Sequence, residues 1–134
     1  MALDVKQVST AALAYLGDGV WELLVRQMLV EKGISDSRRL NTEALNYVTA
    51  SAQAVVVKKI LSELTEEEDA VYRRGRNIGH TNVPKRATVM EYRMATGLEA
   101  LFGYLHLTER TDRIEELFAL AFRIGEEDNE QSQG

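Results

Sequence analysis

The segment "ALAYLGDGVWELLVRQMLV" at residues 12–30 is apolar at almost every position, yet it places Asp18 between Gly17 and Gly19. Apolar residues at this density favour a buried helix. Each glycine inside a helix costs about 1 kcal/mol relative to alanine, and a carboxylate on an apolar segment is costly unless it is paired. The segment therefore predicts a closely packed helix whose central acid needs a partner or a function.

Helical patterns cover nearly all of the chain, and no strand pattern or internal repeat is found. Apolar spacing and capping residues predict where each helix starts and ends. The expected helices run from Ser9 or Thr10 to about Lys32 before Gly33, from Ser35 or Asp36 through "SDSRRLNTEALNYVTA", from a Ser51 cap through "AQAVVVKKILSEL", from a Thr65–Glu68 capping box through "TEEEDAVYRRGRN", from about Thr88 to Leu107, and through "TDRIEELFALAFRI" to Gly125. The three valines at 55–57 would also suit a strand, but the flanking periodicity favours a helix.

These elements predict an all-α, single-domain helical bundle over residues 1–125. The only proline, Pro84, lies in "IGHTNVPKRAT", which predicts a loop of about ten residues. The polar, acidic segment 126–134 predicts a disordered tail.

The first helix is apolar on most of its circumference, which is typical of a helix that is buried all round. Its apolar residues are Leu13, Leu16, Val20, Trp21, Leu23, Leu24, Val25, Met28 and Leu29. Such a helix lies at the centre of a bundle or in a subunit interface. For a chain of 134 residues we expect both, and hence a homodimer.

Composition narrows the class of protein. Hydrophobic residues make up 45% of the chain, enough for a core, and there are no cysteines for disulfides or thiolate chemistry. No apolar run is long enough to span a membrane, and the N-terminal residues show no secretory pattern. We expect a cytoplasmic protein without a membrane partner.

A second acid, Glu99, lies in another apolar stretch, "ATGLEALFGYL" at residues 95–105. If the two helices pack together, Asp18 and Glu99 could face one another. Two carboxylates at hydrogen-bonding distance repel and need a proton or a cation between them. Mg²⁺ suits such a pair, because it is often held by one or two carboxylates, water and substrate phosphate. The alternative is that each acid is exposed or paired with Arg or Lys.

Positive charge is concentrated in one segment of an acidic chain. The net charge is −5, but residues 73–93 carry six basic side chains and one acidic. The candidate RNA contacts in this segment are Arg73, Arg74, Arg76, Asn77, Lys85, Arg86 and Arg93. Phosphate binding depends on where the cations are and not on the total charge. The alternative is a solvated face that complements a helix C-terminus.

"YLGDGVWEL" resembles the signature helix of the ribonuclease III endonuclease domain, and "ATGLEALFGYLHL" resembles that family's second acidic helix. With "RRGRN" between them, the chain to about residue 125 resembles the Mini-III ribonucleases, which lack the double-stranded-RNA-binding domain of the larger enzymes. The resemblance implies a helical bundle of the ribonuclease III endonuclease type. It also places Asp18 and Glu99 on the family's catalytic and metal-binding acids.

The same resemblance implies a dimeric, Mg²⁺-dependent endoribonuclease that cleaves double-stranded RNA. Its implied natural substrate is a precursor of large-subunit (23S) ribosomal RNA, with a ribosomal protein as a further candidate partner. Ala14 and Thr96 stand where the larger enzymes carry acids, which favours one protein-held metal ion per protomer over two.

Two other classes of function stay open on the sequence. The first is a non-catalytic double-stranded-RNA-binding or ribosome-associated helical module. The second is an acidic helical adaptor whose segment 73–93 docks a protein partner. An acid near phosphate weakens binding, so Asp18 itself favours the enzyme.

Overall fold

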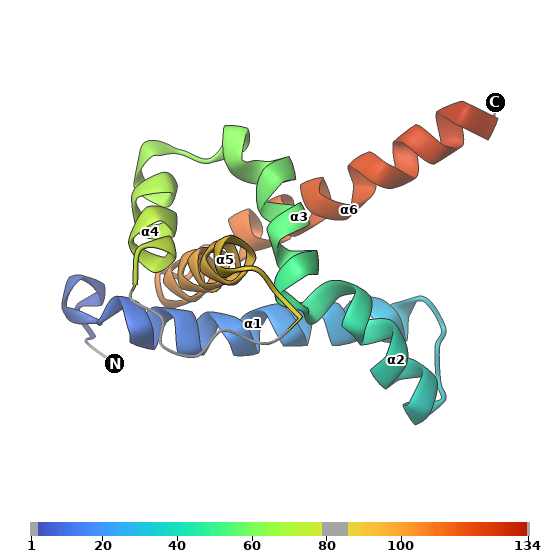
Figure 1. Ribbon diagram of the computed structural model, residues 1–134, viewed down its shortest axis with the longest axis horizontal. Helices are drawn as coiled ribbons and strands as arrows, with labels where there is room; N and C mark the ends of the chain where they lie inside the picture. Colours follow the sequence, from blue (N-terminus) through green and yellow to red (C-terminus); the bar gives the residue numbers. More distant parts are fainter. Residues whose placement is uncertain (1–2, 79–85, 134) are drawn as a thin grey trace.

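The structure, a computed structural model, describes residues 3–78 and 86–133, with side chains described as far as residue 122. All regular elements within these ranges are helical, as predicted (Figure 1). Two short 3-10 helices span Val5–Gln7 and Leu61–Glu63. The α-helices are α1 (Thr10–Glu31), α2 (Ser37–Val48), α3 (Ala50–Ile60), α4 (Glu66–Arg76), α5 (Val89–Leu107) and α6 (Thr111–Gln133).

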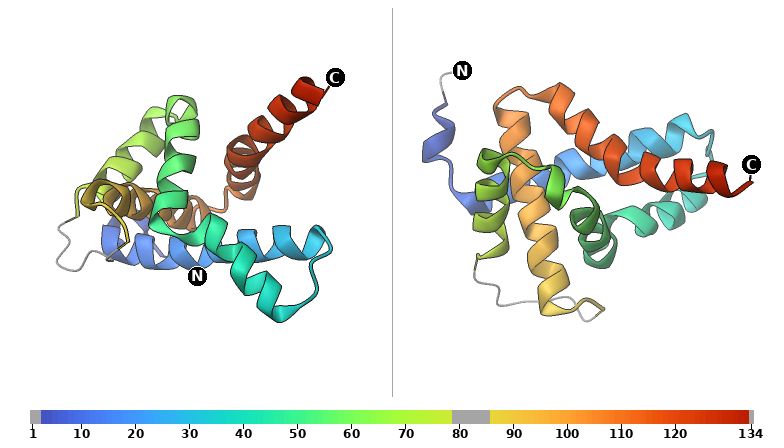
Figure 2. Two further views of the ribbon diagram at one scale, coloured as in Figure 1. Left: turned by 45° about the vertical axis from the view of Figure 1, so that its right-hand side comes forward. Right: turned by 90° about the horizontal axis from the view of Figure 1, so that it is seen from above.

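The central helix of the fold is α5. It packs against α1, α3, α4 and α6, and the view from above in Figure 2 shows it crossing α1. Nine of its residues between Ala95 and Leu105 are buried. The expectation that the first helix is buried all round is wrong for the single chain, since Tyr15, Leu23 and Val30 of α1 are exposed.

Two glycines allow the backbones of α1 and α5 to touch. A Cβ added to Gly17 would lie 1.6 Å from the carbonyl oxygen of Glu99, and one added to Gly103 would lie 2.0 Å from that of Leu13. No side chain fits at either position. The predicted close approach of the two acidic helices is therefore confirmed, and it brings the Asp18 turn of α1 against the Glu99 turn of α5.

The core beside this crossing is built around Trp21, which is fully buried. Its ring makes edge contacts with Phe102 and Phe118, each with centroids 5.2 Å apart. Its indole N–H donates to the Tyr47 carbonyl at 2.9 Å. Trp21 therefore ties α1 to α2, α5 and α6 one turn after Asp18.

A buried ion pair joins α4 to α6. Glu68 is 2% exposed, and the Arg113 guanidinium donates to its two carboxyl oxygens at 2.8 and 2.9 Å. Arg113 also donates to the Glu63 carbonyl at 2.7 Å. The Arg113 hydrogen bond, as the largest cause, lowers the pKa of the Glu68 carboxyl. This buried acid is thus held in its charged form.

Most predicted helix starts are confirmed. Ser9 and Asp36 cap α1 and α2, and capping boxes at Thr65 and Thr88 start α4 and α5. Gly33 follows α1 with a φ of 88°, in the left-handed region that glycine adopts readily.

Two predicted helix boundaries are wrong. Thr49, not Ser51, caps α3, because its extended backbone lets its hydroxyl accept from the Ala52 N–H. Ser51 lies inside the helix and bonds the Glu91 carboxylate instead. The last helix does not end at Gly125 but runs to Gln133, and Figure 1 shows its C-terminal part extending away from the bundle. A glycine weakens a helix without necessarily ending it.

The loop around Pro84 and the candidate contact Lys85 lie outside the described residues. Among the helices that the structure does describe, none is both long and apolar enough to cross a membrane.

Candidate active site

Asp18 and Glu99 meet where α1 crosses α5. Asp18 is exposed and Glu99 is half-buried. The two carboxyl groups are hydrogen-bonded to each other, which confirms the predicted convergence of these acids. Because two ionised carboxylates cannot share a hydrogen bond, one of them carries a proton in the metal-free state.

The proton resides on Glu99 over most of the physiological range. Burial, as the largest cause, and the hydrogen bond and charge of Asp18 raise the pKa of Glu99 from 4.5 to about 8. A hydrogen bond from Gln53 acts in the opposite direction. The protonated Glu99 carboxyl therefore donates to Asp18 while it accepts from Gln53.

Gln53 is a site residue that the sequence analysis missed. It lies in the first turn of α3, is 2% exposed, and its side-chain amide donates to the Glu99 carboxyl. The signal was present in the sequence: Gln53 lies at helical spacing from Val56, Val57 and Ile60, which form the buried face of α3. A polar residue on an apolar stripe indicates a buried partner.

A cavity of about 340 Å³ opens beside Glu99. Gln53, Arg86, Tyr92 and the first turn of α3 contribute to its walls. The structure therefore has open space next to Glu99, and Arg86 is among the residues that line it.

The donor set fits a hard divalent cation. Two carboxylates converge, and an amide lies beside them. Among the described residues there is no group of three or more His, Cys, Asp or Glu side chains that could hold a metal ion. Two carboxylates completed by water and substrate phosphate are a common arrangement for Mg²⁺.

Ala14 and Thr96 add no further charge to the site. Ala14 packs against the apolar cluster of Leu13, Val71 and Ala100. The Thr96 hydroxyl donates to the Tyr92 carbonyl at 3.0 Å. Within the described ranges no third acid joins Asp18 and Glu99 in a group that could hold a metal ion.

The predicted RNA contacts on α4 gather near its C-terminal end. Arg73 is paired with Asp69 at 2.8 Å. Arg76 lies 5.8 Å from the centroid of the Tyr72 ring and donates to the Asn77 side chain at 3.4 Å. Arg74 is exposed.

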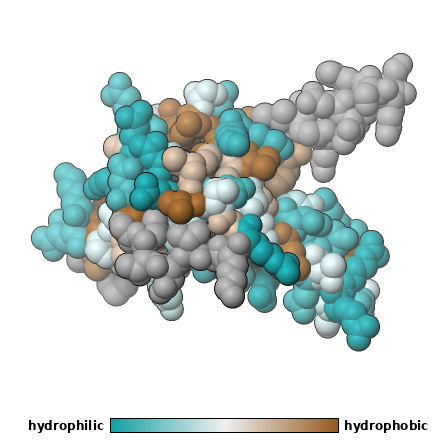
Figure 3. Space-filling view, viewed as in Figure 1, coloured by the Kyte–Doolittle hydropathy of each residue, from teal (hydrophilic) through white to brown (hydrophobic). Residues whose placement is uncertain are grey.

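This end of α4 lies at the same level of α5 as the acidic pair. A Cβ added to Gly75 would lie 2.7 Å from the Ala100 Cβ and 2.8 Å from the Gly97 Cα. The arginines next to Gly75 therefore lie beside the turn of α5 that carries Glu99, on a neighbouring face of that helix. Figure 3 shows hydrophilic side chains along α4.

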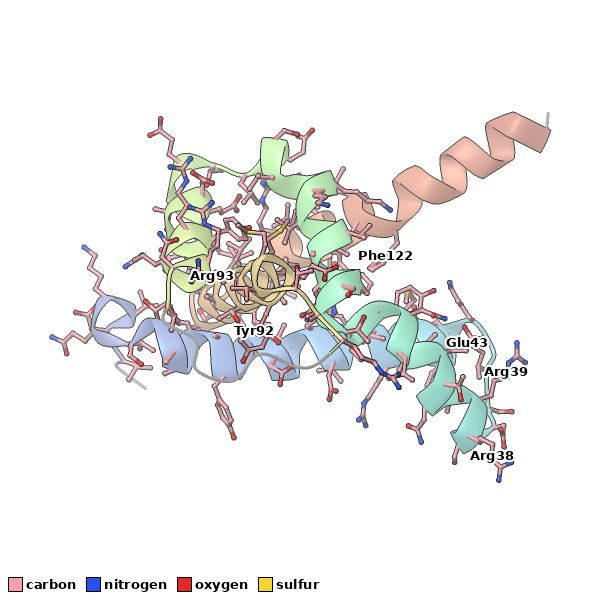
Figure 4. The ribbon with its side chains drawn as sticks, viewed as in Figure 1. Arg38, Arg39, Glu43, Tyr92, Arg93 and Phe122 are labelled. Carbon is pink, nitrogen blue, oxygen red and sulfur yellow. The ribbon has the colours of Figure 1, made fainter. Side chains whose placement is uncertain are left out.

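Arg86 and Arg93 are both exposed. Arg86 lines the cavity beside Glu99, whereas Arg93 lies on the N-terminal half of α5. Figure 4 shows Tyr92 and Arg93 at this end of α5, far from Arg38 and Arg39 at the tip of α2. The described residues of the basic segment therefore lie at the C-terminal end of α4 and near the start of α5.

Comparison with known proteins identifies the family of the chain. The Ribonuclease III domain family matches residues 11–110, a range that contains Asp18, Glu99 and the basic end of α4. The Mini-ribonuclease 3 of Streptococcus pneumoniae is 44% identical over 86% of this chain and 91% of its own length. That of Enterococcus faecalis is 43% identical over 96% of this chain and 98% of its own.

The fold agrees with the sequence comparison. The crystal structure of a Fusobacterium nucleatum protein superposes with a TM-score of 0.81 at 33% identity, covering 94% of this chain and 99% of that protein. The chain belongs to the ribonuclease III family, a class of endoribonucleases. Within that family its similarity over nearly the whole length is to the Mini-ribonuclease 3 enzymes.

Proposed function

We propose that this endoribonuclease depends on Mg²⁺ and cleaves double-stranded RNA, with Asp18 and Glu99 as the catalytic and metal-binding residues of its active site. The observation that carries the proposal is the convergence of these two carboxyl groups from helices far apart in sequence. Among the described residues, the hydrogen-bond partners of Glu99 are an acid and an amide, and no cation contributes to its pKa. A fold that only needed to bury these helices would gain nothing from an acid pair.

The bound metal ion would lower the pKa of a water molecule and stabilise charge on the attacked phosphate. The roles of the chain's own residues follow from their positions. Asp18, exposed on α1, lies where substrate oxygens can reach it. Glu99 is half-buried and hydrogen-bonded to both Asp18 and Gln53, so its carboxyl is held in place within the site.

The basic segment is proposed to bind the RNA duplex. Its proposed contact residues are Arg73, Arg74, Arg76, Asn77, Lys85, Arg86 and Arg93. Double-stranded RNA is recognised mostly by shape, through its backbone and shallow minor groove. Phosphate contacts position a protein without reading sequence. We therefore expect strong affinity for duplexes with little sequence preference from this segment.

A homodimer is the proposed active form. Tyr15 (86% exposed), Leu23 (66%) and Val30 (62%) lie on the outward face of α1. Gly19 lies on that face with nothing within 4 Å of a Cβ placed on it, so no packing against the described residues requires the glycine. A second copy against this face would bury these side chains, and its two-fold axis would match the two strands of a duplex.

The resemblance to the Mini-III ribonucleases suggests three further proposals. The natural substrate is a precursor of 23S ribosomal RNA, and cleavage takes place in the cytoplasm. A ribosomal protein bound to that precursor is a further partner.

Incubation of the protein with long duplex RNA tests the proposal directly. Cleavage is expected with Mg²⁺ and not with excess chelator. Asp18→Asn should abolish cleavage and preserve duplex binding in a gel-shift assay. Cleavage by Asp18→Asn would show that the site is wrongly assigned, and duplex binding without cleavage by the unaltered protein would favour the non-catalytic module.

The basic segment is tested by Arg74→Ala, with Arg38→Ala at the tip of α2 as a matched control. Arg74→Ala should weaken duplex binding and reduce the slope of log affinity against log salt by about one. Arg38→Ala should change neither quantity. Equal behaviour of the two variants would remove α4 from the RNA interface.

A further inference from the structure

Gln53 is one of three polar or charged side chains buried among the described residues, the others being Glu68 and Thr96. Glu68 is neutralised by Arg113, and Thr96 bonds a carbonyl on its own helix. Gln53 instead reaches from α3 to the acid on α5. Burying an amide is unfavourable unless it is hydrogen-bonded, so an apolar residue would pack here more favourably if packing were the only requirement.

The Glu99 carboxyl is held between two helices. Asp18 approaches it from α1 and Gln53 from α3. A glutamate side chain is flexible, so with Asp18 as its only partner the Glu99 carboxyl could turn away from α1. An amide N–H that donates to the Glu99 carboxyl opposes that rotation and lowers the entropy that ion binding would otherwise have to remove.

The chemistry of an amide suits this task better than that of a cation. An Arg or Lys beside Glu99 would hold it too, but would compete with a metal ion for the negative charge. The Glu68–Arg113 pair shows that outcome in the same chain. A neutral donor orients the carboxylate and leaves its charge available.

We propose that Gln53 is a positioning residue that fixes the Glu99 carboxyl toward Asp18 and thereby sets the affinity of the site for its divalent cation. This role depends on the proposed function in one respect, which is that Asp18 and Glu99 form the metal site. Gln53 acts through Glu99, and RNA affinity does not depend on it.

The test compares Gln53→Met with Gln27→Met. Methionine is close to glutamine in size and cannot donate. Gln27 is a matched control, because its amide also donates to a glutamate, Glu31, at 3.0 Å, but at an exposed place on α1. Mn²⁺ binding to the RNA-free protein is measured by electron paramagnetic resonance, together with the Mg²⁺ concentration for half-maximal cleavage, kcat at saturating Mg²⁺, and duplex affinity in chelator.

Gln53→Met should weaken Mn²⁺ binding by about 10- to 100-fold, the usual loss when a partner of a metal ligand is removed. The Mg²⁺ requirement for cleavage should rise by the same factor, while saturating Mg²⁺ restores most of kcat and duplex affinity stays unchanged. Gln27→Met should behave as the unaltered protein. A merely structural role would lower the melting temperature without changing Mn²⁺ affinity.

Gln53→Asn provides a second variant if methionine is not accommodated, because it keeps a buried amide but withdraws it by one methylene. Unchanged Mn²⁺ affinity in a folded Gln53 variant, or an equal loss in Gln27→Met, would overturn the positioning role. If the unaltered protein fails to cleave duplex RNA while the Gln53 variants still lose Mn²⁺ affinity, the proposed function is wrong and the positioning role stands.

Discussion

Two glutamates inside this bundle have opposite surroundings. Glu68, on α4, is 2% exposed and faces Arg113, whose hydrogen bond lowers the pKa of its carboxyl. Glu99, on α5, faces Asp18, and burial together with that second acid raises its pKa to about 8. The first acid is paired with a cation, whereas the partners of the second among the described residues are an acid and an amide.

This difference separates a charge that stabilises the fold from an acid that we propose to be functional. Glu68 caps α4 and joins it to α6, so its ionised form contributes to stability. The ionised form of Glu99 is destabilising in the metal-free chain, and the glycine-mediated crossing of α1 and α5 holds it in place. Uncompensated acids of this kind are typical of functional sites.

The largest expected effect is on cleavage. Glu99→Gln should reduce cleavage by about 1000-fold, because it removes one of the two carboxylates proposed to hold the metal ion that stabilises the developing charge. In chelator it should melt at or above the temperature of the unaltered protein, since a neutral amide replaces the repelled acid. Calorimetry and a duplex-cleavage assay check the two parts.

Glu68→Gln provides the opposite case. It should lower the melting temperature and leave cleavage per folded molecule unchanged. If Glu68→Gln removed cleavage and Glu99→Gln did not, the roles assigned to the two acids would be reversed.

The helix crossing that creates the acid pair is tested by its glycines. Gly17→Ala should destabilise the fold by about 3 kcal/mol or more, at the upper end for overpacking, because its Cβ would lie 1.6 Å from the Glu99 carbonyl oxygen. Gly19→Ala, two residues away and open, should raise the helix stability of the single chain by up to about 1 kcal/mol. Urea unfolding measures both, and equal effects would contradict the close crossing.

Removing the cationic Arg113 side chain should give Glu68 surroundings like those of Glu99, without a cationic partner among the described residues. Arg113→Met leaves a buried carboxyl without its partner and should cost about 3 kcal/mol at neutral pH, the lower end for breaking a buried pair. Much of that loss should disappear near pH 4, where the carboxyl becomes protonated. Loss of the same size at every pH would indicate that Arg113 acts by packing alone.

The pH dependence of stability in chelator also distinguishes the two acids, because they predict opposite slopes. The folded pKa of Glu99 is raised, so the folded chain binds more protons than the unfolded chain between pH 4.5 and about 8, and stability falls as pH rises through that window. The folded pKa of Glu68 is lowered, so its contribution is present above pH 4.5 and is lost as pH falls through its folded pKa.

Urea midpoints across pH measure both slopes. Glu99→Gln should remove the upper slope. Glu68→Gln should reduce the lower slope but not remove it, because hydrogen bonds also lower the pKa values of Glu67 and Glu91. A Glu99→Gln protein with an unchanged upper slope would show that another group titrates there.

The helices and the acid pair could be predicted from the sequence, because capping residues and apolar spacing act locally. Asp18 and Glu99 each stood out as an acid among apolar residues, and both lie beside glycines. The central position of α5 could not be predicted in the same way, since α1 and α5 are about equally apolar and only three-dimensional packing distinguishes them.

Gln53 was missed because a single polar residue on an otherwise apolar helix face does not identify its partner. Its meaning depends on a contact between α3 and α5, which are separated by the whole of α4. The Thr49 cap was missed because Thr49 and Ser51 have similar capping propensity, and the backbone conformation decides between them.

The claim that Asp18 and Glu99 together hold a divalent ion is tested most directly by anomalous diffraction from crystals soaked in Mn²⁺. The account predicts a peak between the two carboxyl groups, with metal–oxygen distances of about 2.1–2.2 Å, close to those of Mg²⁺, and no such peak in Glu99→Gln. A Mn²⁺ peak elsewhere with the acid pair still hydrogen-bonded to each other would contradict it.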